Sequence, residues 1–107
     1  MDLKLHGVRG SIPVPSRKVL KYGGHTTCME ISSDTFQLII DLGSGFKNVK
    51  IKKNIPTFIV FSHFHHDHTQ GFPFNSAVYD KDIQFHISSA LLNRTEILRV
   101  LENCFSP

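Results

Sequence analysis

The stretch that decides the fold reads Phe58-Ile-Val-Phe-Ser-His-Phe-His-His-Asp-His-Thr-Gln-Gly71. Four apolar residues, Phe58 to Phe61, are followed after Ser62 by a cluster of four histidines and one aspartate, and a glycine ends the cluster. A short continuous apolar run is typical of a strand that is buried on both faces. Neutral imidazoles and a carboxylate are ligands that zinc, iron and manganese accept. A buried strand that ends in such a cluster predicts a metal site on a rigid support.

The spacing of the cluster divides its residues into two pairs. His63 and His65 are two positions apart, so their side chains would point to the same side of an extended backbone. Asp67 and His68 are adjacent and would have to diverge, which suits them to a second metal rather than to the first. The alternative is a solvent-exposed polyhistidine loop or the remnant of a tag. The apolar strand before the cluster and the glycine turn after it argue against that alternative.

The pattern H-x-H-x-D-H at these positions resembles the metallo-β-lactamase fold superfamily, whose dinuclear members carry it on the loop after a central strand. The resemblance implies that His63 and His65 bind one metal and that Asp67 and His68 bind the other, with Asp67 also taking part in catalysis. It implies two divalent ions, zinc in the first place and manganese or iron(II) as alternatives. His66 falls at a variable position of the motif and is not expected to be a ligand.

Four further blocks resemble the phosphodiesterase branch of this superfamily, which includes tRNase Z and the cyclic-nucleotide and cyclic-phosphate phosphodiesterases. The blocks are Gly7-Val-Arg-Gly-Ser-Ile-Pro13, Gly23-Gly-His-Thr-Thr-Cys28, Ile40-Asp-Leu-Gly-Ser-Gly45 and Gly71-Phe-Pro-Phe74. Asp41 stands at the aspartate of the family's glycine-rich motif, which implies that it orients a ligand histidine through the ring N–H. The alternative for Asp41 is a turn residue that starts a helix. His25 stands where these blocks often have asparagine.

The resemblance implies a metal-dependent hydrolase. Two divalent ions about 3.5–4 Å apart can hold a bridging hydroxide that attacks phosphorus, and they neutralise charge on the phosphoryl group. A cyclic nucleotide is the first substrate expected, and an RNA 3′ end is the second. Metal-bound hydroxide attacks thioester and β-lactam carbonyls equally well, so the flanking blocks and not the metal motif favour phosphodiesters. The phenylalanines follow strand and helix patterns and are expected in the core, not on a base-stacking surface.

The order of elements predicts an α/β fold with a mixed sheet that carries helices on one face. Strands are expected at Leu3–Val8, Cys28–Ser32, Phe36–Asp41, Thr57–Ser62 and Ile83–Ile87, a hairpin turn at Ser33–Thr35, and helices at Phe46–Lys53 and from an N-cap at Ser89 to Leu101. Four lysines between Lys47 and Lys53 are expected on a solvated helix face, with attraction of an anionic substrate as the alternative. The resemblance places these elements in an αββα sandwich, of which this chain supplies roughly the first half.

Length and composition indicate one domain, residues 1–107. The apolar content of 40% and the charged content of 20% are ordinary for a globular chain, and the formal net charge of +3 is mild. No run approaches the roughly 18 apolar residues of a membrane span, and the N-terminus lacks an apolar signal segment, so a cytoplasmic protein is expected. Cys28 and Cys104 form no spacing pattern and are expected to be reduced thiols.

The resemblance also implies that the chain stops before the family's remaining ligands, which are a histidine, a bridging aspartate and a final histidine. Coordination would then be incomplete, and the half-sandwich would leave sheet edges and an apolar face uncovered. Three interpretations stay open: a fragment of a full hydrolase, a chain that pairs with itself or with a complementing second half, and a metal-binding or interaction module without activity. His6 and His86 are expected to have no catalytic part.

Overall fold

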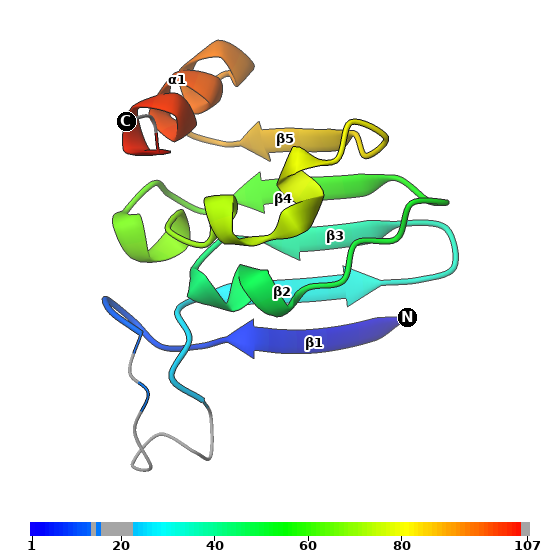
Figure 1. The fold of residues 1–107 in the computed structure, drawn as a ribbon, viewed down its shortest axis with the longest axis horizontal. Helices are drawn as coiled ribbons and strands as arrows, with labels where there is room; N and C mark the ends of the chain where they lie inside the picture. Colours follow the sequence, from blue (N-terminus) through cyan, green and yellow to red (C-terminus); the bar gives the residue numbers. More distant parts are fainter. Residues whose placement is uncertain (14, 16–22, 106–107) are drawn as a thin grey trace.

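The computed structural model describes residues 1–13, 15 and 23–105, which form one mixed five-stranded sheet (Figure 1). The strands are β1 (Asp2–Gly7), β2 (Cys28–Ser32), β3 (Gln37–Ile40), β4 (Thr57–Phe61) and β5 (Phe85–Ser89), and this is also their order across the sheet. β2 pairs antiparallel with both β1 and β3, whereas β4 runs parallel to β3 and β5. The predicted α/β class and mixed sheet are confirmed. The side chain of Cys104, which was predicted to be a reduced thiol, lies outside the described part of the structure.

One face of the sheet carries the core. In the described part of the chain, four short 3₁₀ helices and one α-helix follow or connect the strands: η2 (Ser44–Asn48), η3 (His66–His68), η4 (Phe72–Phe74), η5 (Ser76–Tyr79) and α1 (Arg94–Phe105). Ile39 and Ile59 from the central strands pack in one cluster with Phe46 of η2 and Ile97 of α1, and all four side chains are buried. The helices and the core therefore occupy the same side of the sheet. None of the described helices is long and apolar enough to cross a membrane.

The opposite face of the sheet is apolar and uncovered. The strand registers align its side chains in two rows, Leu5–Met29–Ile40–Val60 and Leu3–Ile31–Leu38–Phe58. Leu3 and Leu5 are 63% and 59% exposed, and Phe58 and Val60 of β4 are 39% and 37% exposed. The expectation that β4 is buried on both faces is therefore wrong, because nothing among the described residues covers this side. The uncovered apolar face that a half-sandwich would leave is present, and we call it the open face.

The prediction of a helix over residues 46–53 is wrong for its second half. η2 ends at Asn48, and Val49 is already extended. Side chains from distant elements hold the backbone that follows: Gln37 donates to the carbonyl of Lys50 and accepts from the N–H of Lys52, at 2.9 and 3.1 Å. Asn75 donates to the carbonyls of Phe46 and Val49. The lysines of this segment consequently do not share one helix face.

The chain between β5 and α1 also differs from the prediction. β5 ends at Ser89, and the α-helix begins at Arg94 rather than directly after Ser89. Asn93 and Glu96 exchange two hydrogen bonds, from the N–H of Glu96 to Asn93 Oδ1 (2.9 Å) and from the N–H of Asn93 to Glu96 Oε1 (3.2 Å). This is a capping box, which satisfies the free N–H groups of a helix start. Ser89 instead accepts from the N–H of Leu91 in the preceding turn.

Candidate metal centre

The centre lies where the parallel strands β3 and β4 end. Ile40 is opposite Val60 in the register, so the residues that follow the two strands meet at one edge of the sheet. Asp41 comes directly after β3, and Ser62 and His63 come directly after β4. The N–H of Asp41 donates to the carbonyl of Val60 at 2.9 Å, which continues the pairing one step beyond β3. The histidine cluster therefore follows a central strand that is hydrogen-bonded to a parallel neighbour on each side.

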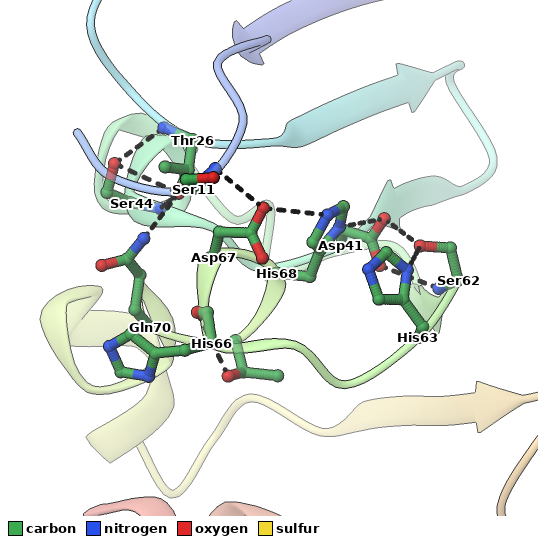
Figure 2. A network of polar contacts seen from close by, with 11 residues as sticks. Ser11, Thr26, Asp41, Ser44, Ser62, His63, His66, Asp67, His68 and Gln70 are labelled. Carbon is green, nitrogen blue, oxygen red and sulfur yellow. Dashed lines mark hydrogen bonds and ion pairs between the residues drawn. The ribbon is translucent and has the colours of Figure 1, made fainter. Parts of the chain in front are cut away.

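Three of the predicted ligands converge. His63, Asp67 and His68 each offer one ligand atom, and these atoms lie within 4.8 Å of one another (Figure 2). Asp67 and His68 do not diverge, because they lie in the tight turn of η3 and not in extended backbone. His68 Nε2 is 3.3 Å from Asp67 Oδ2.

This geometry fits a divalent ion. Two ligand atoms bound tetrahedrally to zinc at its usual bond lengths are about 3.4 Å apart, close to the separation of the Asp67 and His68 atoms. Two imidazoles and a carboxylate form a donor set that zinc, iron and manganese accept. His65 is exposed and lies beside His63, with the rings 4.6 Å apart and edge to face, but it is not a member of the three-residue group. His66 is exposed and also stands outside it.

Asp41 is buried beneath the group and contacts one of its histidines. Its Oδ2 lies 2.9 Å from Nδ1 of His68, a buried nitrogen that has no hydrogen-bond partner among the described residues. Asp41 has a φ of 63°, a left-handed conformation that costs a residue other than glycine about 1–3 kcal/mol. Gly43, not Asp41, precedes η2, so the alternative of a helix-starting residue is not supported.

Ser62 joins Asp41 to a second histidine, a role that the sequence did not predict. Its N–H and its hydroxyl donate to the two carboxylate oxygens of Asp41, at 2.8 and 2.6 Å. Its Oγ is also 3.0 Å from Nδ1 of His63. Since the hydroxyl hydrogen is used on Asp41, the oxygen can accept from a protonated Nδ1 of His63. The only feature of the sequence that could have indicated this role is a serine between the apolar strand and His63.

Ser11 reaches the group from the other end of the chain. Its N–H donates to Asp67 Oδ2 at 3.1 Å, and its φ of 71° is also left-handed. Burial raises the pKa of Asp67, but the hydrogen bond from Ser11 and the charges of His68 and His63 outweigh it, so the pKa lies below its ordinary value. Asp67 is therefore ionised near neutral pH, as a metal ligand must be. Among the described residues other than glycine, Ser11 and Asp41 alone have a positive φ, and both contact this group.

The loop that carries the ligands packs on the loop after β3. Gly71 donates its N–H to the carbonyl of Leu42, and Leu42 donates to the carbonyl of His68, both at 2.8 Å. A Cβ on Gly71 would collide with the carbonyl oxygen of Gly43. Gln70 donates to the hydroxyl of Thr26 at 2.9 Å. Close backbone contact thus sets the position of η3 relative to Asp41.

The remaining histidines lie apart from the group. His6 contacts Glu30 (2.8 Å), which also accepts from Gln37 (2.7 Å) on the core side of the sheet. His86 lies on β5 opposite Phe58. His25 Nδ1 is 3.1 Å from the hydroxyl of Ser44. None of the three belongs to the metal group found among the described residues.

Comparison with known proteins supports the superfamily resemblance. Ribonuclease Z of Clostridium kluyveri is 37% identical to this chain over 78 residues, which cover 68% of the chain and 23% of the ribonuclease. The chain therefore spans about a quarter of the length of the curated relative that it matches. No family model and no solved structure matches the chain. The similarity to a ribonuclease Z supports the metallo-β-lactamase superfamily and does not distinguish its phosphodiesterase branch in detail.

Proposed function

We propose that this chain carries part of the active site of a metal-dependent hydrolase that cleaves phosphodiester bonds of RNA. The observation that carries the proposal is the convergence of His63, Asp67 and His68 at the end of the central strands. The similarity to a protein named as a ribonuclease makes an RNA end the first candidate substrate and a cyclic nucleotide the second. This order is the reverse of the one expected from the sequence alone.

The chain's own residues prepare the donors. Asp41 faces Nδ1 of His68, which leaves Nε2 of that ring, beside Asp67, as the donor to an ion. Ser62 accepts from Nδ1 of His63 in the same tautomer and leaves Nε2 of that ring free. A divalent ion held here would supply the positive charge that polarises a phosphoryl group.

The proposed centre binds two divalent ions. We propose that His63 and His65 serve one ion and that Asp67 and His68 serve another, zinc first and manganese or iron(II) as alternatives. The described residues bring together three donors in one group, which falls short of two complete sites. The further ligands would come from further sequence of a longer hydrolase, from a second copy of the chain or from a complementing half of the fold.

The experiment that tests the proposal combines metal content and solution mass with hydrolysis. Purified chain is assayed with Mn²⁺ on a generic phosphodiester, on cyclic AMP and on an RNA with a 3′ extension. We expect close to two ions per chain on an oligomer, and RNA cleavage that His63→Ala abolishes. Asp34→Ala is the control, because Asp34 is exposed in the turn between β2 and β3 outside the group.

Other outcomes would contradict the proposal in distinct ways. Little or no metal on a monomer would show a half-site without activity of its own. Metal binding without hydrolysis of any of the three substrates would favour a metal-binding module. Activity that survives His63→Ala would come from a contaminant.

A further inference from the structure

A surface hollow borders the candidate metal centre without being part of it. It has a volume of about 580 Å³, and its lining includes Pro13, Pro15, His25, Ser44, Lys47 and Phe74. Its wall is linked to the ligand loop, because the Ser44 hydroxyl accepts from the N–H of Thr26 (2.9 Å) and the Thr26 hydroxyl accepts from Gln70 (2.9 Å). Figure 2 shows Ser44, Thr26 and Gln70 on one side of Asp67, and His68 and His63 on the other.

An exposed aromatic ring forms one wall of the hollow. Phe74 is 73% exposed, which contradicts the expectation that the phenylalanines lie in the core. Its backbone is fixed at the end of η4, where its N–H donates to the carbonyl of Gly71 at 3.1 Å. A phenylalanine left in water forgoes the stabilisation that burial of its ring would give. A ring so placed, with two prolines in the same lining, offers an apolar surface for a flat ligand.

The polar part of the lining favours an anion. Lys47 lies in the last turn of η2, and no ion pair among the described residues includes it, whereas Lys53 pairs with Asp80 at 2.9 Å. No carboxylate occurs among the described lining residues. A phosphate group that entered the hollow would meet one ammonium group and no like charge.

We propose that this hollow binds one nucleotide of the substrate, with the base against Phe74 and the phosphate at Lys47. Base stacking on an aromatic side chain together with a cation for the backbone is the usual way to hold single-stranded nucleic acid. The inference rests on the proposed function, because a nucleotide held here would position the adjoining phosphodiester at the metal group. A free nucleotide and an RNA end share this chemistry.

The test measures binding in EDTA, so that it does not depend on the metal. Adenosine 5′-monophosphate, cyclic AMP and an RNA trinucleotide are titrated into the chain by calorimetry. Phe74→Ala and Lys47→Ala are each expected to weaken binding about tenfold, while Phe74→Tyr restores it. The controls are Leu91→Ala and Lys4→Ala, which remove an exposed apolar group and an exposed charge elsewhere. Tighter binding of the trinucleotide assigns the site to RNA, and tighter binding of a mononucleotide assigns it to a free nucleotide.

Failure of this inference is separable from failure of the proposed function. Absence of binding by all three probes, or equal affinity in Phe74→Ala, Lys47→Ala and wild type, overturns the nucleotide site. An equal loss in the control variants shows non-specific attraction and overturns it as well. His63→Ala is expected to keep nucleotide binding in EDTA while it loses hydrolysis. Binding without hydrolysis by the wild type would therefore contradict the catalytic proposal alone.

Discussion

At the scale of single residues, Asp41 connects two histidines of the metal group. It contacts His68 directly and reaches His63 through Ser62. Asp41→Asn keeps the size of the side chain and tolerates the left-handed backbone, but it replaces one acceptor by a donor. We expect affinity for Zn²⁺ to fall about 10–100-fold, as for other partners of ligand histidines, measured by competition with a chromophoric chelator.

The control for this substitution is Asp34→Asn, because Asp34 lies exposed in the turn between β2 and β3. Its zinc affinity should equal that of the wild type. Equal affinity in Asp41→Asn would show that Asp41 does not orient the ligands.

Cys28 is a buried thiol at the start of β2. Burial, and then the charges of Glu30 and Asp41, raise its pKa to about 12 from an ordinary 9.0. In a Cys104→Ser variant at pH 8, we expect alkylation by iodoacetamide to be about a thousandfold slower in the folded than in the urea-unfolded chain, since the thiolate is the reactive form. Rapid alkylation of the folded chain would contradict the burial of Cys28.

The raised pKa of the Cys28 thiol also makes the free energy of unfolding depend on pH. The unfolded chain loses the thiol proton above pH 9.0, while the folded chain keeps it until about pH 12. The stabilisation is therefore complete below pH 9 and is lost as the pH rises towards 12. Cys28→Ala should lessen the fall in unfolding free energy across this range, measured by urea denaturation.

Which residues of the centre could be predicted depends on how local their contacts are. His63, Asp67 and His68 could be named because they share one short motif. Ser11 could not, because its contact with Asp67 joins positions 56 residues apart and uses a backbone N–H, which any residue type could supply.

At the scale of elements, the existence and order of the strands could be predicted, although the last strand is found at Phe85–Ser89 rather than at Ile83–Ile87, and the helix boundaries could not. Apolar runs and alternation depend on near neighbours, so the hairpin of β2 and β3 is confirmed at Ser33–Thr35. The end of η2 depends on Gln37 and Asn75, whose side chains bind the following backbone from other elements. No sequence pattern between Phe46 and Lys53 indicates where η2 ends.

Close packing of two loops gives a prediction at the same scale. A methyl group on Gly71 would collide with the backbone of Gly43, and neither loop can retreat without loss of the hydrogen bonds through Leu42. We expect Gly71→Ala to lower the free energy of unfolding by about 3 kcal/mol, the upper end for overpacking, in urea denaturation. Gly10→Ala is the matched control, because nothing lies within 4 Å of a Cβ there. Equal stability of the two variants would contradict the close contact.

At the scale of the whole molecule, the open face is an apolar surface that nothing among the described residues covers. Its two rows place eight apolar side chains side by side across four strands, with His86 and Ser88 of β5 at their ends. No charged side chain occurs in these rows, so two copies of the face meet without repulsion. Sheets that pack face to face in this way form the core of β-sandwiches. A second copy related by a two-fold axis would present the same surface and bury both faces.

We therefore expect a solution mass of twice the 12.1 kDa of one chain, by light scattering at micromolar concentration. Phe58→Lys places a charge in the middle of the open face and should give a monomer with an unchanged circular dichroism spectrum, because burying an unpaired ammonium is costly. Leu91→Lys is the control, since Leu91 is 65% exposed but follows β5 outside the face. A monomeric wild type would point to a complementing second half as the occupant. A dimeric Phe58→Lys variant would move the interface to another surface.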